Sequence, residues 1–175
     1  PQIGLTLSEL TFQEVAAALG AGTIDAGFTS APLPEDGKLR FTPLFDDPVS
    51  LILPPERPLL AYERVPVREL DGLDFIMPAR GYDDVYQVIT DQVPIRPNVR
   101  YRVGSDIAAV GMVANRLGVS ILSRQQVRFL GERVVWRDFQ EDFHRTLGVA
   151  THAGRRPSPA LAAFLRTVEG QEAER

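Results

Sequence analysis

Apolar residues recur along this chain at two spacings, one typical of helices and one typical of buried strands. Residues 106–124 show both in succession. Ser105 or Asp106 offers an N-cap, and the following residues carry an apolar helical stripe made of Ile107, Val110, Met112, Val113 and Leu117. Gly118 stands where a left-handed residue commonly ends a helix, and residues 119–122 are an apolar run of strand length. The pattern predicts a helix, a tight turn and a buried strand.

The first thirty residues predict a strand, a helix and a second strand. Residues 3–7 alternate between apolar and polar side chains, as strands do. A helix is expected from Ser8 to Gly20 or Gly22, with one apolar face made of Phe12, Val15, Ala16 and Leu19. Residues 24–28 form the second predicted strand. Two strands joined by one helix indicate a parallel βαβ unit.

The rest of the chain alternates between short apolar runs and helical patterns. Strands are expected at residues 39–45, 49–53, 73–77, 99–103, 134–137 and 146–151, and helices at residues 83–93 and after Pro159. Asp46, Asp47 and Pro48 are expected to separate the first two of these strands, because proline next to acidic residues favours a turn. The whole pattern predicts an α/β fold.

Composition narrows the class of protein. The 175 residues are 44% hydrophobic and 24% charged, as in globular domains, and no apolar run approaches the roughly 18 residues of a membrane helix. Cysteine is absent, which excludes disulfides, a thiol nucleophile and a thiolate metal site. The formal net charge of -4 argues against nucleic-acid binding by this chain itself, because such modules neutralise phosphates with clustered cations.

Residues that could perform catalysis do not form a recognisable constellation. His144 and His152 are the only histidines, and their spacing fits neither a metal pair nor a local catalytic motif. Three acidic pairs, at residues 46–47, 83–84 and 141–142, are adjacent in sequence, so their side chains point in different directions on a strand or a helix and do not converge on one substrate. No nucleophile elbow, Walker loop or dinucleotide fingerprint is found. We therefore predict no catalytic residue, no metal site and no cofactor.

Five segments together carry a resemblance to a known family. They read L-G-A-G-T-I-D-A-G-F at residues 19–28, P-L-F-D-D-P at 43–48, V-R-E-L-D-G-L-D-F-I at 67–76, V-G-M-V-A-N-R-L-G-V-S-I-L at 110–122 and R-R-P-S-P-A-L-A-A-F-L at 155–165. In order and spacing the chain resembles the effector-binding domain of LysR-type transcriptional regulators. The resemblance implies a two-lobed α/β fold of the periplasmic-binding-protein type II, with two crossing hinge strands and a small ligand in the cleft between the lobes.

The resemblance also implies boundaries and partners. Residues 1–47 and 150–175 would form lobe I, and residues 48–149 would form lobe II with the crossing strands. The family's helix-turn-helix and linker helix are not in this sequence, nor are the first strand and helix of lobe I. DNA binding would belong to that missing N-terminal region, and the domain would pair as an antiparallel dimer within a tetramer in the cytoplasm. For the dimer face we expect residues 12–19 to meet residues 107–117 of a second copy, although both helices also need an apolar face for their own lobe.

The resemblance and the predicted strand ends together point to candidate ligand contacts. Thr29 and Ser30 would follow the carboxyl end of a parallel strand, where open α/β sheets bind ligands, unless that loop hydrogen-bonds only to itself. The loop of Pro78, Ala79, Arg80, Gly81 and Tyr82 offers N–H groups, a guanidinium and an aromatic ring to an anion, unless Arg80 pairs with nearby acidic residues in solvent. Ser105 is a candidate contact as well as a helix cap, and Thr151 is a further candidate with a structural alternative.

These expectations converge on an effector-sensing regulatory domain that binds a small, anionic ligand. A solute-binding protein that delivers a ligand to a transporter is a second interpretation of the same fold. An enzyme on that fold is a third, which the lack of convergent catalytic groups disfavours.

Overall fold

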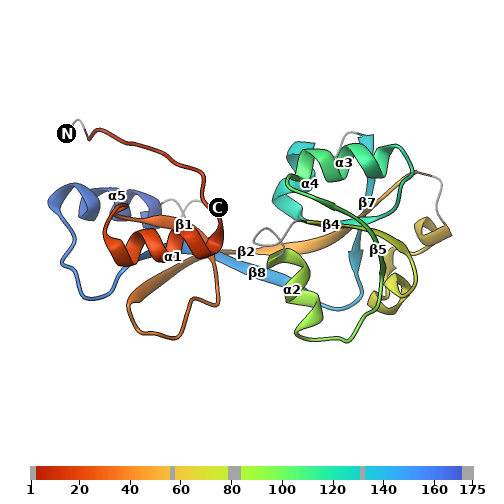
Figure 1. Cartoon of the computed structure of the whole chain (residues 1–175), viewed down its shortest axis with the longest axis horizontal. Helices are drawn as coiled ribbons and strands as arrows, with labels where there is room; N and C mark the ends of the chain where they lie inside the picture. The colour runs from red at the N-terminus through yellow and green to blue at the C-terminus, as the bar shows by residue number, and fades with distance from the viewer. Residues whose placement is uncertain (1–2, 56–57, 79–83, 131–132, 171–175) are drawn as a thin grey trace. The chain divides into compact units, whose positions relative to one another are not determined.

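The computed structural model describes residues 3–55, 58–78, 84–130 and 133–170. The chain divides into two compact units, unit 1 of residues 1–46 and 146–175 and unit 2 of residues 47–145. Two long strands, β2 (Leu39–Leu53) and β8 (His144–His152), carry the chain from one unit to the other and back (Figure 1). In the described ranges, no helix is both long and apolar enough to cross a membrane.

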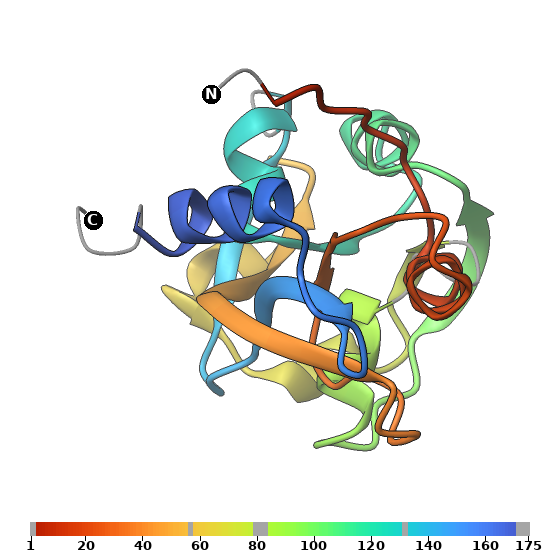
Figure 2. The same ribbon diagram turned by 90° about the vertical axis from the view of Figure 1, so that its left-hand side faces the viewer.

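Unit 1 combines two helices with a small antiparallel sheet. Strand β1 (Gly27–Ser30) pairs with β8, with Gly27 opposite Ala150 and Ser30 opposite Leu147. Helices α1 (Phe12–Ala21) and α5 (Pro159–Gly170) lie on opposite faces of β1 (Figure 2). Consecutive strand residues face opposite ways, so Gly27 meets Val15 of α1 while the ring of Phe28 contacts Phe164 of α5, with centroids 6.2 Å apart.

Helix α1 has well-defined signals at both ends. The Thr11 hydroxyl accepts a hydrogen bond from the backbone N–H of Glu14, and the Glu14 carboxylate accepts one from the backbone N–H of Thr11 at 2.7 Å. This reciprocal capping box satisfies two N–H groups that the helix would otherwise leave unpaired. Gly22 ends the helix in the left-handed conformation, at φ 75°, as the sequence predicted.

The strands of unit 2 form a parallel pair and a second, mixed group. β4 (Asp74–Pro78) pairs in parallel with β5 (Asn98–Val103), and helix α2 (Asp84–Thr90) lies between them in the chain. The second half of β2 pairs antiparallel with β6 (Ser120–Ser123) and with β7 (Val135–Phe139), and β7 pairs in parallel with the short β3 (Arg64–Val65). Further elements in the described part of unit 2 are the 3-10 helices η1 (Pro58–Ala61) and η2 (Val67–Leu70) and the α-helices α3 (Asp106–Ala114) and α4 (Arg124–Leu130).

The core of unit 2 explains its continuous apolar runs. Phe75 belongs to one buried cluster and its neighbour Ile76 to a second one, and Ile121 and Leu122 are divided in the same way. Because consecutive side chains of a strand point to opposite faces, both faces of these strands are covered. The residue ranges predicted for β4, β6, α2 and α3 overlap the observed ranges.

The predicted N-terminal βαβ unit is wrong. Residues 3–11 form no helix or strand, and Leu7 is 90% exposed, so the alternating pattern of residues 3–7 has no sheet to pack on in the described structure. The helix begins at Phe12 rather than at Ser8. The following strand covers residues 27–30 instead of 24–28, and it pairs antiparallel with β8.

The predicted break at Asp46, Asp47 and Pro48 is also wrong, because β2 is one strand of 15 residues. Asp47 is buried within it, where its carboxylate accepts hydrogen bonds from the backbone N–H of Gln125 and from Arg145. A partnered acidic residue can stay inside a strand, whereas an unpaired one favours a solvated turn.

The turn between α3 and β6 differs from the expected one. Helix α3 ends at Ala114, and the residue with positive φ is Arg116, at 63°, rather than Gly118. Gly118 is required for another reason, since a Cβ at this position would lie 2.5 Å from the carbonyl oxygen of Asp74. Only glycine allows β6 to begin this close to β4.

Candidate functional site

Thr29 and Ser30 are the last two residues of β1, not residues of the loop that follows it. The predicted loop position is therefore wrong, although both residues lie at the strand's carboxyl end. Both are buried, at 8% and 7% exposure. By strand alternation Thr29 lies on the α1 side with Gly27, and Ser30 lies on the α5 side with Phe28.

The two hydroxyl residues differ in their bonding. Ser30 takes part in an interaction within the protein. The Thr29 hydroxyl has no hydrogen-bond partner among the described residues. Its oxygen is not one of the unbonded side-chain atoms that are fully enclosed by protein, so it keeps some access to solvent. A reachable, unpaired hydroxyl on a buried residue can serve a ligand without giving up a protein contact. Thr29 is therefore the stronger candidate of the pair.

Strand β8 supplies the residues across from this position. Gly148 lies directly opposite Thr29, and by alternation Thr146 shares the Thr29 face whereas Thr151 lies on the other one. The Thr146 hydroxyl donates a hydrogen bond of 2.7 Å to Asp46, and its backbone carbonyl accepts one from Ala31. The structure thus brings Thr146, which sequence reasoning missed, to the Thr29 face, and it does not bring Thr151 there.

Unit 2 contributes candidates from the ends of its parallel strands. Pro78 is the buried last residue of β4 and lies beside Val103, the last residue of β5. Ser105 follows two residues later as the exposed N-cap of α3, where its hydroxyl accepts the backbone N–H of Ala108 at 3.2 Å. Carboxyl ends of adjacent parallel strands with a helix N-terminus are a favourable place for an anion. Ala79, Arg80, Gly81 and Tyr82 lie outside the described residues.

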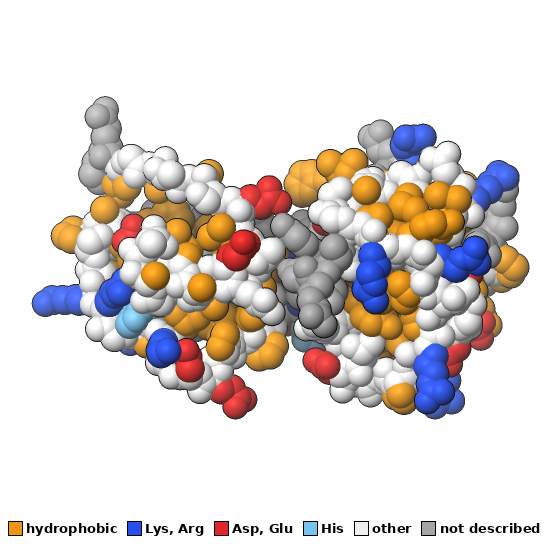
Figure 3. All heavy atoms as spheres, viewed as in Figure 1, with side chains coloured by type: hydrophobic (Ala, Val, Ile, Leu, Met, Phe, Trp, Pro, Cys, Tyr) orange, Lys and Arg blue, Asp and Glu red, His pale blue; other side chains and the backbone are white. Residues whose placement is uncertain are grey.

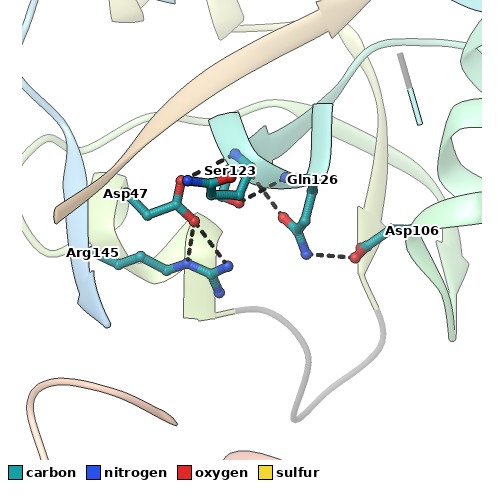
Figure 4. A network of polar contacts seen from close by, with 6 residues as sticks. Asp47, Asp106, Ser123, Gln126 and Arg145 are labelled. Carbon is teal, nitrogen blue, oxygen red and sulfur yellow. Dashed lines mark hydrogen bonds and ion pairs between the residues drawn. The ribbon is translucent and has the colours of Figure 1, made fainter. Parts of the chain in front are cut away.

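A polar network that the sequence did not reveal joins β2, β8, α4 and α3 within unit 2 (Figure 4). The Asp47 carboxylate contacts Arg145 and the backbone N–H of Gln125. Ser123 caps α4 through a reciprocal pair of bonds with Gln126, at 2.9 and 3.3 Å. The Gln126 side-chain amide also donates to Asp106, the residue after Ser105. The serine three residues before a glutamine was the available signal for this cap.

Catalytic or metal-binding geometry does not emerge from the part of the chain that the structure describes. No group of three or more His, Cys, Asp or Glu side chains there could hold a metal ion. The Nδ1 atom of His144 lies 3.9 Å from Asp142, and Nδ1 of His152 accepts the backbone N–H of Gly154. The described geometry offers hydrogen-bond donors and acceptors for a ligand rather than reacting groups.

Comparison with known proteins gives one family across almost the whole chain. The family model of the LysR substrate binding domain matches residues 1–172. The chain is 27% identical over 171 residues to the HTH-type transcriptional regulator MetR of Escherichia coli K12, covering 95% of this chain and 53% of MetR. It is 26% identical to the uncharacterized HTH-type regulator YybE of Bacillus subtilis 168, covering 96% of this chain and 58% of YybE. The chain spans about half the length of the curated relatives it matches.

Solved structures confirm the fold expectation. The regulatory domain of CcmR from Synechocystis PCC6803, in complex with 2-PG, matches 93% of this chain and 80% of its own with a TM-score of 0.83 at 24% identity. The effector-binding domain of QuiR in complex with shikimate matches 93% of this chain and 78% of its own at 0.80 and 18% identity. The effector-binding domain of BenM with its effector benzoate covers 95% of this chain and 78% of its own at 0.80 and 17% identity. At such low identities these similarities establish the architecture of the α/β effector-binding domain.

Proposed function

This chain belongs to the LysR substrate-binding domain family, and on that basis we propose that it senses a small, anionic effector on behalf of a LysR-type transcriptional regulator. The match of the family model to residues 1–172 is the observation that carries the proposal. Domains of this family regulate transcription and are not enzymes. The chain's own role is therefore to bind, and not to transform, a small molecule.

The anionic character of the effector is supported by two lines of reasoning. Shikimate and benzoate, bound by QuiR and BenM, are both carboxylates. In this chain the N-terminus of α3 presents backbone N–H groups and a positive dipole end beside the Ser105 hydroxyl. A carboxylate would be stabilised there, and Arg80 would add a guanidinium that can bind it in a bidentate manner.

Within unit 1, the hydroxyl of Thr29 is the proposed effector contact, with Ser30 and Thr151 as weaker candidates. Among the described residues, nothing bonds the Thr29 hydroxyl, whereas Ser30 already takes part in an interaction within the protein. Pro78, at the end of β4, and Ala79, Gly81 and Tyr82, next to Arg80 in the sequence, are further proposed contacts. Binding would act by population shift, because an effector favours whichever arrangement of the protein gives it the higher affinity.

The proposal is tested by thermal unfolding of this chain with benzoate, shikimate and neutral benzyl alcohol, which has the aromatic ring of benzoate without its charge. A ligand at 100 times its dissociation constant stabilises the folded state by about 2.7 kcal/mol. We expect at least one carboxylate to raise the Tm while benzyl alcohol leaves it unchanged. An equal rise in Tm with benzoate and with benzyl alcohol would contradict an anionic effector. A broader set of carboxylates and phosphorylated acids that all fail to raise the Tm would contradict effector sensing.

The longer protein would act on DNA and as an oligomer. MetR and YybE are named HTH-type regulators, and this chain covers about half of each, so we assign DNA binding to a region outside this chain. An antiparallel dimer, paired again into a tetramer, would place α1 of one copy against α3 of the other, in the bacterial cytoplasm. Ile107 on α3 is 71% exposed, whereas Val15 and Leu19 of α1 are buried in their own unit. Apolar side chains are exposed among charged ones on the face of unit 2 drawn in Figure 3, and we expect α3 to supply most of the apolar contact.

A further inference from the structure

The chain passes from unit 1 to unit 2 between Asp46 and Asp47, and it returns between Arg145 and Thr146. Both passages lie inside continuous strands, β2 and β8, which are neighbours in one sheet. A side-chain contact joins the two strands on each side of the passage. Thr146 donates to Asp46 in unit 1, and Arg145 pairs with Asp47 in unit 2.

These two contacts differ in burial and in charge. The Asp47 side chain is completely buried, and the Arg145 side chain is 13% exposed. Two guanidinium nitrogens of Arg145, Nε and Nη2, lie 3.4 and 3.3 Å from Oδ2 of Asp47. Asp46 is exposed, and its contact with Thr146 involves a single neutral hydroxyl. Screening by solvent weakens the exposed contact, while the buried ion pair is much less screened.

Asp47 also connects strands β2 and β8 to helix α4 of unit 2. Its second oxygen, Oδ1, accepts the backbone N–H of Gln125 in the first turn of α4 at 3.2 Å. Helix α4 is itself tied to α3, because Gln126 donates to Asp106 while capping with Ser123. One carboxylate therefore holds β8 through Arg145, α4 through Gln125, and α3 indirectly (Figure 4).

We propose that the Asp47–Arg145 ion pair is a clamp that anchors both passing strands in unit 2 and limits how freely the two units move with respect to each other. Bending or shearing β2 against β8 at this point separates the guanidinium from the buried carboxylate. The Asp47 carboxylate would then lose its cation in a place with little access to water, which is strongly unfavourable. Strands β2 and β8 would therefore bend more easily on the unit 1 side of the passage, where the contact between Asp46 and Thr146 is exposed.

The clamp is tested without any effector, by measuring distances between spin labels placed on each unit. The chain contains no cysteine, so Gln13→Cys on α1 and Gln87→Cys on α2 introduce two labels at exposed positions. Pulsed electron paramagnetic resonance then gives the distribution of label-to-label distances. In Asp47→Asn we expect this distribution to widen by roughly half or more, as for a hinge that has lost its restraint.

A matched control uses Asp36, which like Asp47 accepts a backbone N–H and pairs with a cation. Asp36 accepts from the backbone N–H of Lys38 at 3.0 Å and lies 3.3 Å from the Lys38 amine, but both side chains are exposed and precede β2. Asp36→Asn removes a carboxylate–cation pair away from the passage. We expect it to leave the distance distribution unchanged.

Asp47→Asn removes a buried negative charge that faces Arg145 and can impair folding, so two further variants keep the test decisive. Asp47→Asn with Arg145→Met removes both charges and retains an amide oxygen for the Gln125 N–H, and we expect the same widening. Arg145→Lys keeps the charge but not the two-nitrogen contact, and we expect an intermediate width. A distribution as narrow as that of the parent in the folded double variant, or equal widening in Asp36→Asn, would overturn the clamp. Neither result depends on whether the effector proposal is correct.

Discussion

Gly118 lies against the backbone of Asp74 so closely that a Cβ at this position would be 2.5 Å from the Asp74 carbonyl oxygen. The same oxygen accepts the backbone N–H of Val119 at 2.9 Å, which fixes the start of β6 beside β4. Side-chain atoms could move aside, but a strand backbone held in a sheet cannot do so cheaply. The absence of a side chain at Gly118 therefore sets the spacing of two buried strands.

We predict that Gly118→Ala lowers the free energy of unfolding by about 1–3 kcal/mol, the usual cost of overpacking a core. Gly111, inside α3, is the matched control because a Cβ there would meet nothing within 4 Å. Gly111→Ala should raise the free energy of unfolding by about 0.5–1 kcal/mol, since alanine is the better helix residue. Urea unfolding of the two variants measures both effects, and equal stabilities would contradict the close approach at Gly118.

The two roles of Ser105 can be separated by two substitutions. Ser105→Ala removes the N-cap of α3 and should cost about 1 kcal/mol of stability, whereas Ser105→Gly should cost only a few tenths. If the hydroxyl also contacts the effector, both variants should weaken binding of the carboxylate found by thermal unfolding to a similar extent. Calorimetric titration measures that affinity, and an unchanged affinity in Ser105→Gly would restrict Ser105 to capping.

Thr29→Val should lower the affinity for the same carboxylate roughly two- to tenfold, the value of one hydrogen bond. Valine has nearly the shape of threonine, and the hydroxyl that is lost has no protein partner among the described residues. Stability should therefore stay within about 0.5 kcal/mol of the parent, as for substitutions that break no network. Thr151→Val, on the other face of the strand pair, serves as the comparison. An affinity of Thr29→Val equal to that of the parent would remove Thr29 from the site.

The capping box of α1 makes a prediction about pH. The pKa of the Glu14 carboxyl lies below its ordinary value, first because it accepts the backbone N–H of Thr11 and second because it accepts the Thr11 hydroxyl. A carboxyl with a lowered pKa stabilises the fold above its unfolded pKa, and that stabilisation is lost as the pH falls through the folded pKa. Helix α1 should therefore fray under acidic conditions, in the range below the ordinary glutamate pKa of 4.5.

Thr11→Ala removes the second of these two causes and leaves the first, so the pKa of Glu14 should rise only part of the way toward its ordinary value. Carbon-detected NMR titration of the carboxyl groups measures this directly. The pKa of Asp36 is also lowered, chiefly by the backbone N–H of Lys38, and it should not respond to Thr11→Ala. A Glu14 titration identical in the two proteins would show that the hydroxyl contributes nothing.

The proposed dimer makes α3 the surface to perturb. Ile107→Glu places a charge at an exposed apolar position and should shift a dimer toward monomer in sedimentation experiments at tens of micromolar. Gln87→Glu, at an exposed position on α2, controls for the change in net charge. A parent chain that sediments strictly as a monomer, or an Ile107→Glu variant that dimerises as well as the parent, would contradict the proposed interface.

Several features of this protein follow from local chemistry, and the sequence by itself determines them. The apolar runs of unit 2 predict β4 and β6 because strands covered on both faces contain few polar residues. Ser105 is recognisable as a cap and Gly22 as a helix end, since both depend on neighbouring residues alone. The five segments that resemble LysR-type regulators predict the fold. Hydrophobic periodicity predicts single helices and strands, whereas resemblance to a family predicts how those elements are arranged.

Other features required contacts between residues distant in the chain. Residues 3–7 have the alternation of a strand, but a strand forms only when a neighbour accepts its hydrogen bonds. Asp47 stands in a stretch that resembles a turn in sequence, and its contacts with Arg145, 98 positions away, and with the backbone N–H of Gln125 allow it to stay buried in β2. Gly118 is needed because β4 lies beside it, and it takes the tertiary structure to show that no described residue bonds the Thr29 hydroxyl. Neighbouring residues in the chain specify helix caps, helices and buried strands. Strand pairing, the burial of a charged side chain and the presence of an unbonded hydroxyl depend instead on which distant residues the fold brings together.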